Sequence, residues 1–344
     1  MYQLLNTLYI MTPNAYAHLE NDTLRIDVER QKKLQVPLHH LGSVVCFGNV
    51  MISPALMHRC ADDGISLVLL NGSGRFKARL EGAISGNILL RQAQHRVAAD
   101  EQFALATAQA VIAGKLRNAR QVLMRGARET NDAQDQKVLS DAAVSLANSI
   151  RNLPVAGDLD VVRGIEGDAA KVYFSALPYL VRLNVREHFT MDGRSRRPPR
   201  DRFNALLSFL YSMVMNDCRS ALESVGLDPQ LGFLHAVRPG RAALALDLME
   251  EFRAILADRL ALTLINRGQI TVRDLTEHEG GAVYLEGDAR KVVVTAYQER
   301  KQEEITHPLL ETKMPIGLLP QLQARFMARA IRGEMDGYIP FLVK

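Results

Sequence analysis

The sequence of 344 residues contains no tryptophan and only three cysteines. Cys46, Cys60 and Cys218 are far apart and form no CxxC pair, so neither a disulfide framework nor a thiolate zinc site is expected. No apolar run approaches the ~18 residues of a membrane span. The first residues also lack the basic and apolar regions of a signal peptide. We therefore expect a cytoplasmic protein with reduced, partly buried cysteines and no membrane partner.

Several catalytic and cofactor motifs are also missing. Asn71-Gly-Ser-Gly74 lacks the Lys-Ser/Thr of a phosphate-binding loop, and a hairpin turn explains it better. There is no HExxH and no Gly-x-Ser-x-Gly motif, and the pair His39-His40 has no nearby cysteines or carboxylates. These absences disfavour zinc proteases, serine hydrolases and phosphate-loop enzymes.

Charge is nearly balanced over the chain but uneven along it. The net charge is only +4, with 42 basic and 38 acidic residues. Residues 182 to 202 alone carry a balance of +4, because seven arginines stand against Glu187, Asp192 and Asp201. Guanidinium groups bind phosphates bidentately, so the segment suits a nucleic-acid contact. A solvated loop without a partner explains the same run equally well.

The pattern of apolar residues divides the chain in two. Up to about residue 85 short strand-like segments alternate with turns, interrupted by one helix with Ser53 as N-cap and Pro54 at its first position. After residue 87, long stretches follow the helical period. We predict an α+β multidomain protein, with a small β-rich domain (1–88) followed by a larger all-α domain (89–344). Within the second domain the pattern predicts helices at about 100–125, 134–150, 166–186, 201–224, 241–265, 287–303 and 316–333, and a small hairpin at about 270–285.

Four residues in three segments are candidate metal ligands. They are Glu166 after Gly164, His235 after Gly232-Phe-Leu, and the pair Asp247 and Glu250, which lie three residues apart on one helix. Several carboxylates and one imidazole suit Mg2+ or Mn2+. Each also has a simpler explanation: Glu166 as a first-turn helix stabiliser, His235 as an ordinary core histidine, and the two acids as solvated surface or partners of Arg253.

Together these segments resemble the CRISPR-associated endonuclease and integrase that inserts spacers into CRISPR arrays, the Cas1 family. The resemblance covers essentially the whole chain, and the N-terminal segment is similar to the form found in type I-C systems. The segments that carry it are Ser53-Pro-Ala-Leu56, Gly164-Ile-Glu166-Gly with Tyr173-Phe174, Pro198 to Tyr211 with Asn204, Gly232-Phe-Leu-His235, and Asp247-Leu-Met-Glu250-Glu-Phe-Arg253.

The resemblance implies specific roles. Glu166, His235 and Glu250 match the family's catalytic metal ligands, and Asp247 matches an acidic residue in a supporting position. Asn204 and Tyr211 match positions that we interpret as structural or as support for the site. His235 could be a ligand, a proton-transfer group or both. Four arginines near these segments are candidate DNA contacts: Arg196, Arg197, Arg238 and Arg241.

The implied activity is insertion of short DNA fragments by attack of a 3′-hydroxyl on repeat DNA, with hydrolysis of branched DNA at the same site. The implied cofactor is Mg2+ or Mn2+. The implied partners are double-stranded DNA with 3′ ends, CRISPR repeat DNA, a second copy bound through the β domain, and the small Cas2 protein. The alternative hypothesis is a non-catalytic DNA-bridging or DNA-repair scaffold whose acidic cluster only stabilises helices.

Overall fold

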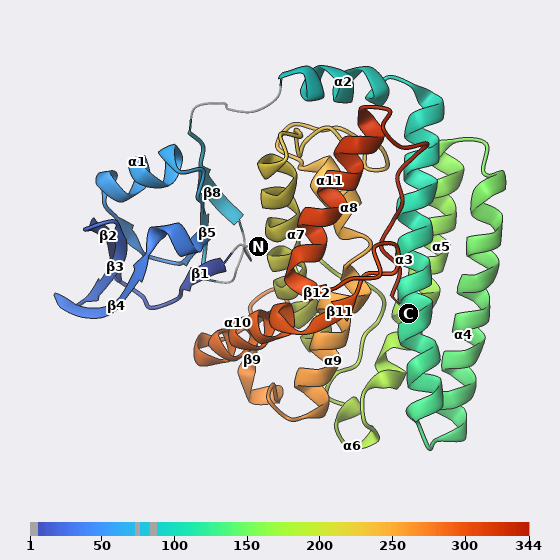
Figure 1. The fold of residues 1–344 in the computed structure, drawn as a ribbon. Helices are drawn as coiled ribbons and strands as arrows, with labels where there is room; N and C mark the ends of the chain where they lie inside the picture. The colour runs from blue at the N-terminus through green and yellow to red at the C-terminus, as the bar shows by residue number, and fades with distance from the viewer. Residues whose placement is uncertain (1–5, 73–75, 83–87, 344) are drawn as a thin grey trace. The chain divides into compact units, whose positions relative to one another are not determined.

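The computed structural model describes residues 6–72, 76–82 and 88–343. The chain divides into two compact units, residues 1–86 and 87–344. Each unit has its own fold (Figure 1), the first rich in strands and the second mostly helical.

The N-terminal unit contains two four-stranded sheets. One has the order β1-β5-β7-β8, in which β1, β5 and β7 are parallel and β8 is antiparallel. The other has the order β4-β3-β2-β6. The strands are β1 (Asn6–Ile10), β2 (Tyr16–Glu20), β3 (Thr23–Val28), β4 (Gln31–Pro37), β5 (Leu41–Phe47), β6 (Met51–Ile52), β7 (Ser66–Leu70) and β8 (Phe76–Leu80).

Helix α1 (Pro54–Asp62) packs into the core of this unit, as the sequence predicts. The Ser53 hydroxyl accepts a hydrogen bond from the Leu56 N–H at 3.2 Å. Leu56 and Cys60 are buried against strand residues of the same core, among them Cys46. All three cysteines are free and buried. Burial raises the pKa of Cys46 to about 12, so its thiol stays protonated.

The C-terminal unit is mostly helical, as predicted, and the hairpin expected at about 270–285 is present, but a second hairpin was not predicted. Two short hairpins, β9 (Leu275–His278) with β10 (Ala282–Leu285) and β11 (Glu304–Thr306) with β12 (Lys313–Pro315), lie between its helices. The helices are α2 (Ile88–Ala98), α3 (Glu101–Glu129), α4 (Ala133–Asn152), α5 (Leu159–Ala176), α6 (Leu183–Arg186), α7 (Arg202–Ser224), α8 (Ala243–Met249), α9 (Arg259–Asn266), α10 (Gly287–Gln302) and α11 (Leu319–Ile331).

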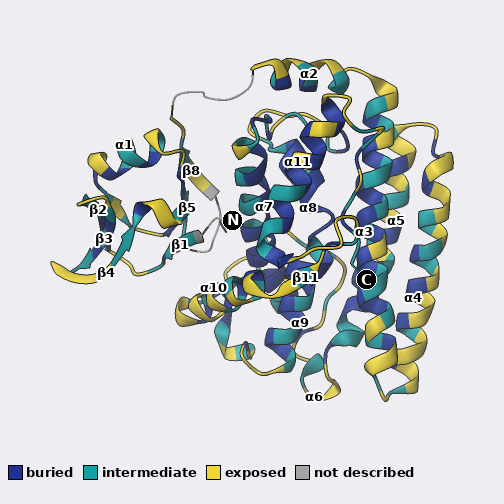
Figure 2. Cartoon of the chain, viewed as in Figure 1, coloured by how far each residue is buried: buried dark blue, intermediate teal, exposed yellow. Residues whose placement is uncertain are grey.

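Three long helices, α3, α4 and α5, lie side by side (Figure 1). Asp100 caps α3 by accepting hydrogen bonds from two backbone N–H groups of its first turn. Figure 2 shows α7 as largely buried, while α4 keeps an exposed outer face. The second unit therefore has its core around α3 and α7, which are the supports of the site described below.

The predicted helix 241–265 is not continuous. Helix α8 ends at Met249, and a π-helical turn, Arg253–Asp258, follows before α9 begins. π-Helical turns inside helices are frequent at functional sites. This one separates Glu250 from α9 and has Arg253, whose side chain is 12% exposed, at one end and the buried Asp258 at the other.

No helix in the parts of the chain that the structure describes is long and apolar enough to cross a membrane.

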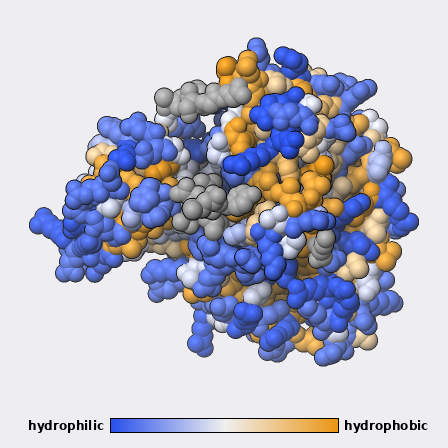
Figure 3. Space-filling model, viewed as in Figure 1, coloured by the Kyte–Doolittle hydropathy of each residue, from blue (hydrophilic) through white to orange (hydrophobic). Residues whose placement is uncertain are grey.

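Figure 3 shows hydrophobic side chains at the exposed start of α2, where Ile88 and Leu89 are each 69% exposed.

The C-terminal segment is attached to α3 and to the residue after Glu250. The fully buried Glu251 carboxylate accepts hydrogen bonds from the Phe341 N–H at 2.6 Å, from the Gln323 amide at 3.1 Å and from the Tyr338 hydroxyl. Asn118 donates to the carbonyl oxygens of Glu251 and Phe341, each at 2.9 Å. The segment therefore fixes the backbone directly beside Glu250.

This contact predicts a pH dependence of stability. Burial raises the pKa of Glu251 from 4.5 to about 8, because it outweighs the three donors. Between these values the native state holds a proton that the unfolded state has released, so stability falls as pH rises. We expect the free energy of unfolding to fall between about pH 5 and about pH 8, by a few kcal/mol at most, and the fall to be smaller in Glu251→Gln. Urea unfolding of both proteins at several pH values measures this, and equal pH slopes would contradict it.

Candidate metal and DNA site

Asp247 organises the site. Helix α8 is buried on all sides, so a carboxylate within it needs partners. Asp247 is fully buried, and its Oδ2 accepts hydrogen bonds from the backbone N–H groups of Phe233 at 2.7 Å and Leu234 at 3.1 Å. Its Oδ1 accepts from the His235 N–H at 3.0 Å. One side chain therefore holds the loop that carries His235.

Gly232 lets this loop approach α8. A Cβ atom at residue 232 would lie 2.6 Å from Asp247 Oδ2 and 2.7 Å from the Ala243 carbonyl carbon. Those atoms belong to a buried carboxylate and to backbone, which cannot easily move. Glycine is therefore required at residue 232 for steric reasons.

His235 is oriented by the same carboxylate. Its Nδ1 lies 2.6 Å from Asp247 Oδ1, a contact that fixes the hydrogen on Nδ1 and leaves Nε2 as the free acceptor. Nε2 faces Glu250, with 3.8 Å between it and Oε1. The side chain of His235 is 18% exposed. A carboxylate behind an imidazole is the arrangement that orients histidine ligands in metal sites.

Glu250 is a buried anion between two cations. Its Oε1 lies 2.9 Å from Arg253 Nη2, and its Oε2 lies 2.9 Å from Lys115 Nζ. Burial alone would raise the pKa of Glu250, but the charges of Arg253 and then of Lys115 outweigh burial and lower it to about 2. Glu250 is therefore ionised at neutral pH and available to bind a cation.

Glu166 faces the same position from α5. The Lys115 ammonium forms an ion pair with Glu166 as well as with Glu250. The prediction that Glu166 lies at the start of a helix is wrong, because Asp158 caps α5 and Glu166 lies two turns inside it. The helix dipole therefore does not explain this glutamate. Arg163, one turn before it, donates to the Leu234 carbonyl at 2.9 Å and links α5 to the His235 loop.

Lys115 was not among the residues that the sequence singled out. It lies on α3 among buried apolar neighbours, Val111, Ile112 and Leu116, and its own side chain is 12% exposed. A lysine on the buried face of a helix needs an anionic partner. The position of Lys115 on the apolar face of the helix could be read from the sequence, but it does not identify which acid is the partner.

The donor set fits a hard divalent cation. Two carboxylates already share one cation, the Lys115 ammonium, and the His235 Nε2 faces one of them. Over the described residues, no three His, Cys, Asp or Glu side chains surround a common point closely enough to hold an ion. The expected Asp247–Glu250 pairing around one cation is also absent here, because Asp247 faces the loop and Glu250 faces Lys115 and Arg253. A metal ion would therefore compete with Lys115.

The guanidinium group of Arg253 packs against the aromatic ring of Tyr211. Its Cζ lies 5.0 Å from the centre of the Tyr211 ring, and Arg194 lies at the same distance from this ring. The hydroxyl groups of Tyr211 and Tyr173 donate to Asp258 at 2.7 and 2.8 Å. Burial raises the pKa of Asp258 to about 6 despite these donors. Tyr211 thus contacts Arg253, the residue that forms an ion pair with Glu250.

The four arginines expected to contact DNA lie near one another. Burial and then the charges of Arg238, Arg196 and Arg197 lower the pKa of Arg241, while Asp247 opposes them. Arg196, Arg197 and Arg238 are exposed, and Arg241 is half-buried.

Other arginines of the same basic segment have internal partners. Arg194 donates to Asn204 Oδ1 at 2.6 Å and to the Ser208 hydroxyl at 3.0 Å. Arg186 pairs with the buried Asp135 at 2.5 Å. The local excess of positive charge therefore does not all face solvent.

Comparisons with known proteins agree on one family. The model of the family described as "CRISPR associated protein Cas1" matches residues 8–299. The "CRISPR-associated endonuclease Cas1 1" of Moorella thermoacetica is 54% identical over 344 residues, which are 100% of each chain.

Two solved structures share the fold. The chain of a "Cas6-RT-Cas1--Cas2 complex" has a TM-score of 0.84 at 22% identity, over 99% of this chain and 36% of that longer one. A "Casposase bound to integration product" has a TM-score of 0.82 at 18% identity, over 97% and 92% of the two chains. Neither comparison names a CRISPR subtype, so type I-C stays a prediction.

Proposed function

Because the chain belongs to the Cas1 family of CRISPR-associated endonucleases, we propose that it is a metal-dependent DNA integrase and nuclease that inserts spacers into a CRISPR array. One observation carries the metal dependence. Glu166 from α5 and Glu250 from the residue after α8 share the Lys115 ammonium, and the Nε2 of His235 lies 3.8 Å from Glu250 Oε1.

Glu166, Glu250 and the Nε2 of His235 would hold Mg2+ or Mn2+. When bound, such an ion stabilises the negative charge that develops on a phosphodiester during attack by a 3′-hydroxyl or by water. Asp247 keeps the His235 hydrogen on Nδ1 and therefore keeps Nε2 free. Arg253 keeps Glu250 ionised. Together these residues prepare the oxygens and the nitrogen for a cation before DNA arrives.

The partners follow from the same proposal. Arg196, Arg197, Arg238 and Arg241 would bind the phosphate backbone of double-stranded DNA and of the CRISPR repeat. A second copy would bind through the β-rich unit, and a Cas2 protein would complete the assembly, as the name of the Cas6-RT-Cas1--Cas2 complex suggests. We expect this assembly to work in the cytoplasm.

A metal titration tests the proposal against a non-catalytic scaffold. The ion pairs of Lys115 with Glu166 and of Arg253 with Glu250 favour this alternative, because they already neutralise both carboxylates. A bound ion must raise stability, by about 2.7 kcal/mol at 100 times its Kd. We expect Mn2+ to raise the melting temperature of the wild type and of His278→Ala, an exposed histidine outside the site, but not of His235→Ala. Equal stabilisation of all three proteins would reject the ligand assignment.

The chemistry has its own test. DNA fragments that end in a 3′-hydroxyl are expected to become joined to repeat DNA, whereas 3′-dideoxy fragments are not, because they lack the attacking group. Hydrolysis of branched DNA should persist with both. Joining of dideoxy fragments would exclude 3′-hydroxyl transesterification.

The exposed arginines give a quantitative prediction. The Arg196→Ala/Arg197→Ala double variant should reduce the slope of log K against log salt by about 1.8, since each lost phosphate contact lowers it by ~0.9. DNA binding measured by fluorescence anisotropy at several salt concentrations gives this slope. An unchanged slope would remove both residues from the DNA-binding surface.

A further inference from the structure

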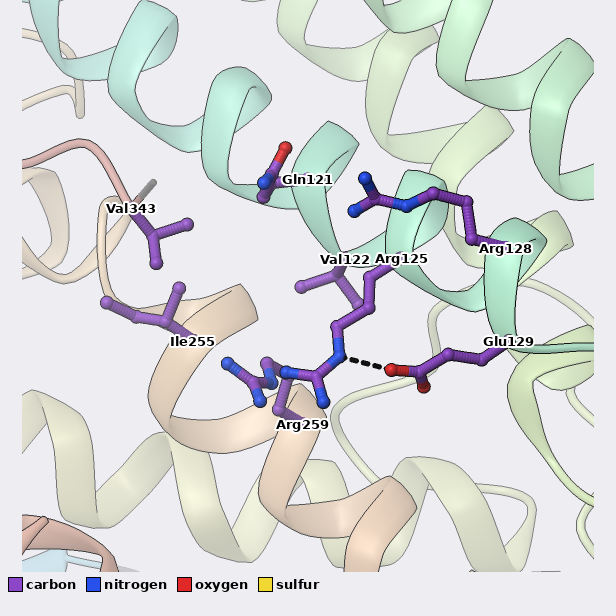
Figure 4. A pocket seen from close by; sticks show the side chains of 8 residues that line it. All are labelled: Gln121, Val122, Arg125, Arg128, Glu129, Ile255, Arg259 and Val343. Carbon is purple, nitrogen blue, oxygen red and sulfur yellow. Dashed lines mark hydrogen bonds and ion pairs between the residues drawn. The ribbon is translucent and has the colours of Figure 1, made fainter.

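A basic cavity lies between α3 and the start of α9, apart from the residues assigned to the metal site. Its volume is about 350 Å³. Figure 4 shows the Arg125 side chain from α3 and the Arg259 side chain from α9 pointing toward one another across it. The lining residues are Gln121, Val122, Arg125, Arg128, Glu129, Ile255, Arg259 and Val343.

The positive charge in this cavity is not balanced. Glu129 is the one acid of the lining, and it is already paired with Arg125, with 2.6 Å between Nε and Oε1. Arg259 is half-buried, and its guanidinium forms no ion pair or hydrogen bond with any residue that the structure describes. Burial, then Arg300 and Arg125, lower its pKa, while Glu303 and Glu129 only partly oppose them. A half-buried guanidinium among like charges is stabilised by an anion.

The shape and chemistry of the lining favour a phosphate group. Guanidinium groups bind phosphate oxygens in pairs, and three of them supply donors from two helices together with the amide of Gln121, which has no hydrogen-bond partner among the described residues. Val122, Ile255 and Val343 form an apolar wall that reduces competition from water. Nothing in the lining except Glu129 would repel an anion.

The cavity is also placed along the same two elements as the metal site. Helix α3 and the segment after Glu250 meet at Lys115 and again at Arg125 with Arg259. Lys115 and Arg125 are ten residues apart in sequence, which is roughly 15 Å along a helix. We propose that this cavity is a phosphate-binding site, filled by a phosphodiester of bound DNA or by a free phosphate compound. The DNA source rests on the proposed function, whereas the site itself does not.

A metal-free thermal shift experiment tests the site. In EDTA, inorganic phosphate at 10 times its Kd should raise the melting temperature of the wild type by about 2 °C above a chloride control of equal ionic strength. The rise should disappear in Arg259→Gln and persist in Arg267→Gln, which removes the same charge from an exposed residue at the other end of α9. Arg128→Gln, at an exposed position of the lining, should weaken the rise and serves if Arg259→Gln does not fold.

Salt-dependent DNA binding, also without metal, distinguishes the two sources. A fall of ~0.9 in the log–log salt slope of Arg259→Gln, but not of Arg267→Gln, identifies a DNA phosphate. An unchanged slope together with the phosphate-specific stabilisation identifies a free phosphate compound. An unchanged slope without that stabilisation overturns the proposal. Neither measurement depends on metal or catalysis, so the result is independent of whether the integrase proposal holds.

Discussion

Replacing Glu250 with glutamine is expected to lower metal-dependent integration and cleavage by at least ~100-fold, a loss of the size seen when one stabilising group of a transition state is removed. The amide is a far weaker ligand for a hard cation than the carboxylate. The same change should lower the free energy of unfolding by about 3 kcal/mol or more, because the buried Lys115 and Arg253 would lose a shared counter-charge.

Two measurements check this prediction. Integration and branched-DNA cleavage are assayed at a temperature where the variant is folded, and stability is measured by denaturant unfolding. Glu334→Gln is the matched control, since Glu334 forms exposed ion pairs with Arg329 and Arg332, which contribute about 0–1 kcal/mol. Wild-type activity in Glu250→Gln would show that this carboxylate is not a ligand.

Replacing Asp247 with asparagine is expected to weaken Mn2+ binding and activity by roughly 10- to 100-fold, the range for residues that orient metal ligands. Its oxygens face three backbone N–H groups and the Nδ1 of His235. The amide N–H2 of asparagine must face two of these donors in either orientation, so the loop that carries His235 loses hydrogen bonds and His235 is held less firmly. The buried mismatch should lower stability by about 1–3 kcal/mol.

The Asp247→Asn and Glu250→Gln variants should differ in how their activity responds to Mn2+ concentration. High Mn2+ concentration should restore part of the activity of Asp247→Asn, because the three ligands are still present, but none of the activity of Glu250→Gln. Asp168→Asn is the control, since Asp168 is an exposed acid two residues from Glu166. Failure of excess Mn2+ to restore any activity would mean that Asp247 does more than orient His235.

Local signals in the sequence predicted many elements but not all. Ser53 and Pro54 begin α1 as expected, and residues Thr23–Val28 form β3. The strand-like segments that the pattern predicts, at about 4–10, 23–28, 44–47, 65–70 and 75–80, do not include β2, β4 or β6. Strand β4 begins Gln-Lys-Lys and lies at a sheet edge with one neighbour, so it needs no apolar alternation. The interruption after Met249 was missed because the sequence 241–265 is apolar and lacks Gly or Pro near the break.

The contacts of the candidate site were also only partly predictable from local sequence. Motif resemblance selected Glu166, His235, Asp247 and Glu250, and the structure links Glu166 to Glu250 through Lys115 and His235 to Asp247 by a hydrogen bond. The contacts that decide their states come from distant residues: Lys115 on α3 is 51 residues from Glu166 and 135 from Glu250. Helical periodicity could place this lysine on a buried face, but only the packing of α3 against α5 and α8 pairs it with these acids.

The Lys115 ion pairs also bear on how the protein survives without metal. Structural metal sites often fold only with their ion, because the site is not formed in the unfolded chain and ion binding supplies free energy of folding. Here an internal ammonium joins Glu166 to Glu250, and Arg253 adds a second positive charge. The two carboxylates are thus neutralised by the chain itself. If the proposed ion binds, it would exchange one cation for another, so chelators should remove the ion and leave the fold intact.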